Sequence, residues 1–318
     1  MTEYSIYWAG YHPEKSVQAQ SVFFIKNQLE KLYGADIDFK FVSDVGDLGH
    51  KAIDLLKLVE DGQIDCCYFF SSYLTENVNE LNLFEIPFQI SSRDMVYNLL
   101  DGEIGEFLSN EVEHKTGYKV IGWWDNGIRH LSSNKKLIQT IDDCKNLTIR
   151  IAKNSMHKLA FETLGFTTKF IDVKNLKNAI VQNEIDTQEN PLTNIINYGI
   201  EDYHKHITLS SHLYGNSILL CNKKKYYSWD KLFQNNLNEI IKKATAHQRQ
   251  LAINEDVRCM KYLKKKGTQI IEIDQTLRDI MKLRCQEACG NTIEKFPDDI
   301  RRKSVSYTHL TLPTNREV

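Results

Sequence analysis

The stretch Asp36-Ile37-Asp38-Phe39-Lys40-Phe41-Val42 alternates polar and apolar residues through Phe41, as expected of a β-strand with one buried face. An earlier strand is predicted over residues 5–9, and Pro13 suits the first turn of a helix that runs toward Leu32. Gly34 stands where the C-terminal cap of that helix is needed. The order strand, helix, strand predicts a β-α-β unit.

The same alternation continues along the next segment of the chain. Residues 51–60 carry an apolar stripe at helical spacing, Gly62 breaks it, and Ile64-Asp65-Cys66-Cys67-Tyr68-Phe69-Phe70 is typical of a buried strand. A helix over residues 93–108 and a strand over 118–124 follow. Strands that alternate with helices pair in parallel, so these segments predict one α/β lobe.

A second α/β series begins near residue 126. Its predicted strands cover residues 147–152, 168–171 and 184–187, and its predicted helices cover 155–164 and 173–182. Strand-like segments at 207–209 and 217–222 could cross back to the first lobe, before a helical pattern over 229–265 and a short strand at 269–273. The pattern predicts two α/β lobes joined by crossing strands.

Composition limits the classes of function. The 318 residues are 42% hydrophobic, enough to fill a sizeable core, and the formal net charge of -2 lacks the basic excess of a nucleic-acid binder. No run reaches the roughly eighteen apolar residues of a membrane-spanning helix. The N-terminus enters a strand directly and lacks the build of a secretory signal, which fits either a cytoplasmic protein or a mature form whose signal has been removed.

The seven cysteines are odd in number and scattered, so we expect small buried hydrophobic residues rather than a disulfide framework. Cys285 and Cys289 share one helix face, but the two further ligands of a structural zinc site are missing nearby. Neither a metal site nor a cofactor site is predicted. The common signatures of hydrolases, nucleotide-binding enzymes and zinc proteases are also absent from the sequence.

Arg150 is the sharpest candidate for a functional side chain. It lies in the predicted strand over residues 147–152 between two isoleucines, and alternation places it on the face opposite both. A guanidinium matches a carboxylate with two parallel hydrogen bonds, which indicates a carboxylate receptor. The alternatives are an ion pair with Glu189 or Asp186, or a solvated strand face. Arg129 allows the same interpretations.

Several distinctive segments follow one another along the chain. They are Asp47-Leu48-Gly49, Leu83-Phe84-Glu85-Ile86-Pro87-Phe88, Asn126-Gly127-Ile128-Arg129, Lys145-Asn146-Leu147-Thr148-Ile149-Arg150-Ile151 and Ile185-Asp186-Thr187-Gln188-Glu189-Asn190-Pro191. In this order they resemble the Q-L-G, P-[FY], N-G-x-R, K-G-L-K-[IL]-R-V and V-D-G-Q-E-N-P elements of one family. The chain resembles the substrate-binding subunits of tripartite ATP-independent periplasmic (TRAP) transporters, of the C4-dicarboxylate-binding type.

The resemblance covers roughly residues 4–305. It implies a two-lobed α/β fold of the class II periplasmic-binding-protein type, with a ligand cleft between the lobes. It also implies that Arg150 pairs with a substrate carboxylate, that Arg129 and Asn190 assist, and that Glu189 and Gln188 support them.

The chain departs from the family pattern at several positions. Thr187 and Asn146 replace glycines of the pattern, so the local backbone there can differ. In family members that bind sialic acid, a glutamate and an arginine come from one particular strand end. The matching segment here is Phe70-Ser71-Ser72-Tyr73-Leu74, which contains neither residue. Sialic acid is therefore not the expected ligand.

Aromatic residues near the predicted strand ends could wall the apolar body of a ligand. They are Trp8, Tyr11, Tyr73, Trp124, Phe170 and Tyr214. All but Trp8 are included in the predicted ligand site, and Tyr11 and Tyr73 are its preferred members. The alternative for each ring is a place in the core.

The sequence therefore predicts a periplasmic or otherwise extracytoplasmic solute-binding protein, without enzymatic activity, that delivers a small organic acid to TRAP membrane subunits. We expect it to act as a monomer. We expect lobe 1 to comprise residues 1–126 and 215–254 and lobe 2 to comprise 127–214 and 255–305, with 306–318 as a non-native or disordered tail. Two alternatives stay open: an enzyme on a similar fold with Glu189 or His212 as a base, and a ligand-sensing domain.

Overall fold

A mixed β-sheet forms the centre of the molecule in the computed structural model, which describes residues 3–293. The predicted tail at 306–318 lies outside the described residues. Within them, strands follow the spatial order β2 (Ile37–Val42), β1 (Tyr4–Ala9), β3 (Cys66–Phe70), β8 (His206–Asn222), β4 (Tyr118–Ser133), β7 (Thr187–Pro191), β5 (Thr148–Ile151) and β6 (Thr167–Phe170), with β9 (Gln269–Glu272) beside β8.

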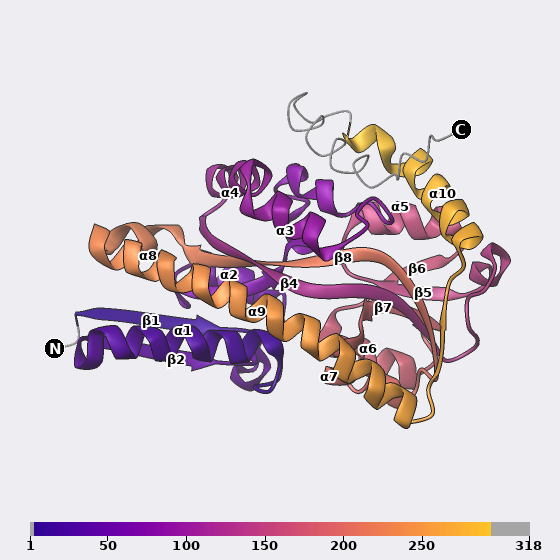
Figure 1. The fold of residues 1–318 in the computed structure, drawn as a ribbon, viewed down its shortest axis with the longest axis horizontal. Helices are drawn as coiled ribbons and strands as arrows, with labels where there is room; N and C mark the ends of the chain where they lie inside the picture. Colours follow the sequence, from indigo (N-terminus) through magenta and orange to yellow (C-terminus); the bar gives the residue numbers. More distant parts are fainter. Residues whose placement is uncertain (1–2, 294–318) are drawn as a thin grey trace, which may run out of the picture.

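Parallel pairs stand at the two ends of the sheet and antiparallel pairs at its middle, where β9 also pairs in parallel with β8. β1 pairs in parallel with β2 and β3, and β5 pairs in parallel with β6 and β7, as the alternating pattern predicted. The central strands β4 and β8 are antiparallel to each other and to their outer neighbours β7 and β3. Figure 1 shows β4 and β8 running side by side along the length of the molecule.

The two central strands are longer than predicted. The predicted strand 118–124 continues to Ser133, and the segments at 207–209 and 217–222 are parts of one strand. Register shifts between Asp125 and Gly127 and between Arg129 and Leu131 explain the difference. An extra residue at a bulge bends a strand without ending it, although it interrupts the alternation seen in the sequence.

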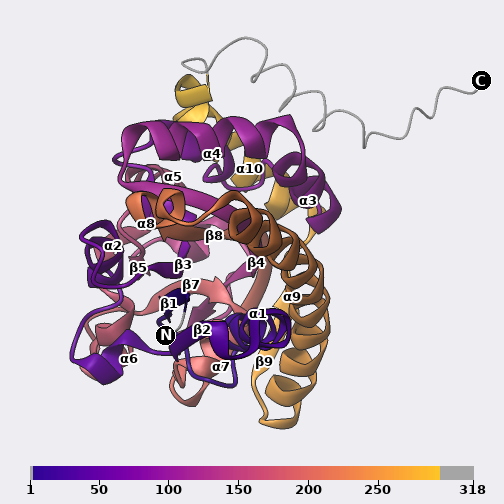
Figure 2. The ribbon, with the colours of Figure 1, turned by 90° about the vertical axis from the view of Figure 1, so that its left-hand side faces the viewer.

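Helices cover both faces of the sheet (Figures 1 and 2). They are α1 (Val17–Tyr33), α2 (Asp54–Glu60), α3 (Arg93–Asp101), α4 (Glu103–Lys115), α5 (Ser155–Leu164), α6 (Val173–Val181), α7 (Leu192–Asn197), α8 (Lys223–Ser228), α9 (Lys231–Lys265) and α10 (Gln275–Ile293). The single helix predicted over 93–108 is wrong, because Gly102 adopts an extended conformation that separates α3 from α4.

Separate hydrophobic clusters fill the two ends of the sheet. At one end, α1, α2, α3 and α4 pack against β1 and β3. At the other end there are two clusters: α5 and α10 pack against β5, and α6 and α7 pack against β8. Helix α9 joins the ends, since Phe233 and Leu237 lie in one cluster and Cys259 and Leu263 in another. These clusters are the cores of two lobes, and the residue boundaries given above stay a prediction.

All seven cysteines are buried and free, as expected. In residues 3–293, no helix combines the length and the apolar character needed to cross a membrane.

Candidate functional site

A narrow pocket lies where strand ends from both halves of the sheet meet. Its lining residues are Tyr11, Ala52, Phe69, Phe70, Tyr73, Asn126, Arg129, Arg150, Ala152, Val173, Asn190, Asn194 and Tyr198. The cavity volume is about 20 Å³. A cavity of that size holds about one water molecule, so a larger ligand requires the walls to move apart.

Arg150 is buried in this pocket without an acidic partner. Its side chain is 2% exposed, and its Nε donates a hydrogen bond to the Ile171 carbonyl at 2.7 Å. Its Nη2 is buried and has no hydrogen-bond partner among the described residues. Within residues 3–293 Arg150 forms no ion pair, because Asp186 accepts from the Thr148 amide and Glu189 pairs elsewhere. Neither structural alternative considered for Arg150 holds.

Arg129, by contrast, is neutralised by Glu189. Its Nε donates to Glu189 Oε2 and its Nη2 donates to Glu189 Oε1 at 2.7 Å, and both side chains are 2% exposed or less. Burial opposes ionisation of Glu189, but Arg129 and His212 hold the pKa of its carboxyl well below its usual range. Arg129 therefore offers hydrogen-bond donors to the pocket without adding net charge.

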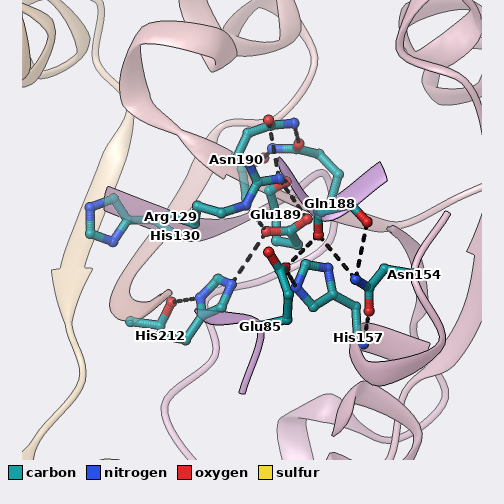
Figure 3. Close-up of polar contacts among 12 residues, drawn as sticks. Glu85, Arg129, His130, Asn154, His157, Gln188, Glu189, Asn190 and His212 are labelled. Carbon is teal, nitrogen blue, oxygen red and sulfur yellow. Dashed lines mark hydrogen bonds and ion pairs between the residues drawn. The ribbon is translucent and has the colours of Figure 1, made fainter. Parts of the chain in front are cut away.

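Asn190 is held in place by a chain of hydrogen bonds (Figure 3). Its Oδ1 accepts from Arg129 Nη2 at 3.3 Å, and its Nδ2 donates to Gln188 Oε1 at 2.5 Å. Gln188 in turn donates through Nε2 to Ser132 Oγ at 2.5 Å. Gln188 and Glu189 thus hold the side chains of Asn190 and Arg129 in place, and their supporting role in ligand binding stays a prediction.

The two side chains considered as an enzymatic base lie behind the pocket. His212 Nε2 is 3.4 Å from Glu189 Oε2, and His212 Nδ1 is 2.7 Å from Ser210 Oγ (Figure 3). Neither Glu189 nor His212 lines the pocket. A second buried pair, Glu85 and His157 at 2.7 Å, also lies outside the lining. These groups interact with one another and not with the cavity.

Two of the predicted aromatic residues line the pocket and three do not. Tyr11 and Tyr73 are in its wall. Trp124 is 1% exposed and packs in the core beneath α9, because both faces of β4 are covered there. Phe170 is 48% exposed and pairs in register with Ile151, so it lies on the sheet face opposite Arg150.

The third misplaced aromatic residue is Tyr214. Its hydroxyl donates to the Ser91 carbonyl at 3.0 Å, outside the pocket. Trp8, the other aromatic residue considered, is fully buried in the core.

Sequence reasoning missed Asn126, Asn194 and Tyr198 as pocket residues. Asn126 is the first residue of the N-G-x-R segment that also contains Arg129, and this position could have indicated that it lines the pocket. Asn194 and Tyr198 are four residues apart at helix α7 and its C-cap, so they share one face. Burial raises the pKa of Tyr198 and of Tyr11, so both rings face the pocket with neutral hydroxyl groups.

Behind these rings, burial lowers the pKa of His12 to about 3, so the imidazole is neutral near pH 7. In the unfolded chain a histidine has a pKa of about 6.5. Between pH 6.5 and 3 the unfolded state binds more protons, so stability falls as the pH falls through this window. We expect His12→Phe to reduce that loss by up to about 1.4 kcal/mol per pH unit.

Urea denaturation of both proteins between pH 7 and pH 4 checks this expectation. Replacement of the exposed His114 by glutamine serves as the control for loss of a histidine at the surface. Parallel curves for wild type and His12→Phe would contradict the burial of a neutral His12.

The chain matches the family model "Bacterial extracellular solute-binding protein, family 7" over residues 8–295. An uncharacterized protein of Haemophilus influenzae is 29% identical over 95% of this chain and 91% of its own length. The match confirms the family that the ordered motifs predicted.

Solved structures share the fold. A TRAP periplasmic solute-binding protein from Sulfurospirillum deleyianum with bound succinate superposes with a TM-score of 0.88 at 22% identity, covering 96% of this chain and 100% of that one. The sugar acid binding protein DctPAm from Advenella mimigardefordensis, in complex with galactonate, gives 0.89 at 20% identity, covering 96% and 97%. The two-lobed α/β fold class is therefore confirmed. The chain belongs to family 7 of the bacterial extracellular solute-binding proteins.

Proposed function

We propose that this protein captures a small organic acid outside the cytoplasm by pairing the acid's carboxylate with Arg150, and delivers it to the membrane subunits of a TRAP transporter. The observation that carries the proposal is the buried Nη2 of Arg150, which has no partner in the described part of the chain. A buried guanidinium without an anion is costly, and a ligand carboxylate would satisfy both its charge and its donors.

The ligand also has hydrogen-bonding neighbours. Arg129 and Asn190 present polar groups to the same pocket, and Tyr11 and Tyr73 wall its sides. Because Glu189 already neutralises Arg129, Arg150 carries the one uncompensated positive charge among the residues lining the pocket. One carboxylate at Arg150 would make this set of residues electrically neutral.

Binding requires an opening of the cleft. Contacts bridge its two sides, including Lys153 Nζ to Glu76 Oε2 at 2.9 Å and Asn154 Nδ2 to Thr75 Oγ1 at 3.1 Å. We infer that the lobes, with the boundaries predicted above, separate by bending β4 and β8 near the bulge at Gly127, whose φ is 100°. Breaking a few polar contacts would then admit the acid, and closure would bury it.

The family supports transport rather than catalysis, and the placement of Glu189 and His212 behind the pocket supports the absence of an enzymatic base. The relatives bind succinate and galactonate, which are both carboxylates. That the protein acts as a monomer is a further proposal, which light scattering coupled to size-exclusion chromatography tests.

A thermal-unfolding screen tests the proposed function. Dicarboxylates, sugar acids and keto acids are compared with the neutral amides and alcohols of the same carbon skeletons. A ligand at about 100 times its dissociation constant stabilises the native state by about 2.7 kcal/mol. We expect stabilisation by at least one acid and by none of the neutral analogues. Stabilisation by neutral analogues alone, or by nothing in the panel, would overturn the proposal.

A further inference from the structure

Beside Arg150, a second polar side chain of the pocket is buried without a partner. Asn194 is 5% exposed and lines the pocket, and its Oδ1 has no hydrogen-bond partner within residues 3–293. A buried acceptor left unsatisfied costs about 1–3 kcal/mol. The carboxylate held by Arg150 cannot satisfy this atom, since both groups are acceptors.

His12 lies next to Asn194 and is also unsatisfied. It is fully buried, and neither ring nitrogen has a hydrogen-bond partner in the part of the chain that the structure describes. Its ring stacks on Tyr198 with centroids 5.9 Å apart and packs against Tyr11 at 4.2 Å, so two walls of the pocket fix its position. Burial lowers the pKa of this ring and the nearby Asn194 side chain opposes that effect only in part, so His12 is a neutral neighbour of Asn194.

The missing partner of Asn194 is a hydrogen-bond donor. An ammonium group would supply one, but it would lie in the same pocket as the positive charge of Arg150. A hydroxyl group donates without charge and also accepts, which suits a wall that carries the neutral hydroxyls of Tyr11 and Tyr198. The chemistry of the subsite therefore favours an alcohol over an amine.

We propose that Asn194 Oδ1 accepts a hydrogen bond from a hydroxyl group of the ligand, so that the protein selects hydroxylated acids over acids of equal length without a hydroxyl. This inference rests on the proposed function, in which Arg150 holds the carboxylate.

Three pairs of acids test the proposal, each pair sharing a carbon skeleton: malate and succinate, erythronate and butyrate, galactonate and hexanoate. Calorimetric titration of wild type should give at least tenfold tighter binding of the hydroxylated member in at least one pair. Asn194→Leu, which keeps the side-chain size, should weaken that member about tenfold and leave the other within about threefold.

Matched variants separate the subsite from general damage. Asn82 is also 5% exposed with an unpartnered Oδ1, but it does not line the pocket, so Asn82→Leu should keep the preference. Asn194→Ser gives a second variant if leucine prevents folding, and should lose the preference too.

The outcomes distinguish the two proposals. A preference that persists in Asn194→Leu, an equal weakening of both acids, or acid binding by wild type without any preference would overturn the hydroxyl subsite and leave the role of Arg150 intact. Failure of wild type to bind any of the six acids would count against the proposed function itself.

Discussion

Replacing Arg150 by methionine is expected to weaken acid binding at least 100-fold while making the ligand-free protein more stable. Removing one partner of a buried, hydrogen-bonded charge pair costs about 2–5 kcal/mol of binding energy, and 100-fold corresponds to about 2.7 kcal/mol. In the ligand-free protein the same change removes a buried charge with an unpartnered Nη2. We expect the free energy of unfolding to rise by about 1–3 kcal/mol.

Calorimetric titration measures the binding and urea denaturation measures the stability of each variant. Arg150→Lys is the matched variant, because lysine keeps the charge and lacks the planar fork of donors. It should bind with an affinity between those of wild type and Arg150→Met. Unchanged affinity in Arg150→Met would show that the carboxylate binds elsewhere, and a large loss of stability would show that Arg150 has a structural partner.

The opposite effect on stability is expected at Arg129. Arg129→Met leaves the buried carboxylate of Glu189 without its main partner, which costs about 3–5 kcal/mol of stability. His212, at 3.4 Å from Glu189, offers only a weak substitute. The double variant Arg129→Met with Glu189→Leu removes both charges and should recover most of this loss, since a buried ion pair can be replaced by apolar residues at little cost.

Urea denaturation measures these changes against a matched arginine. Arg249 also forms two hydrogen bonds to a carboxylate, at 2.6 and 2.8 Å, but its partner Asp101 is 59% exposed. Arg249→Met should therefore cost about 1 kcal/mol or less. If Arg129→Met costs no more than Arg249→Met, or if the double variant is as unstable as the single one, Glu189 is not the buried partner described above.

Most helices and strands could be predicted from local patterns in the sequence. The predicted helix 155–164 has the same bounds as α5, since Asn154 caps its start and Gly165 ends it with a φ of 108°. The long strands β4 and β8 were predicted in pieces, because bulges break the period of alternation while pairing continues. Local periodicity therefore located the elements and missed the strands that connect the lobes.

The site was predicted in part, for reasons that lie in tertiary structure. The alternation of side chains along the strand indicated that Arg150 lies on a covered face. Only the tertiary structure shows that Glu189 pairs with Arg129 and that Arg150 has no ion-pair partner within residues 3–293. Trp124 was wrongly assigned to the ligand site because its strand is covered on both faces. The sequence of such a strand does not indicate which side chains face the core and which face the cleft. Asn194 and Tyr198 were missed because α7 is a short helix of six residues, too short for its apolar pattern to reveal which face meets the cleft.

The most direct test of the role of Arg150 is a crystal structure of the protein with the acid that stabilises it most in the thermal screen. We predict that both carboxylate oxygens lie about 2.7–2.9 Å from guanidinium nitrogens of Arg150, with the Arg129–Glu189 pair unchanged. A carboxylate bound away from Arg150, with Nη2 still lacking an anionic partner, would contradict the assignment.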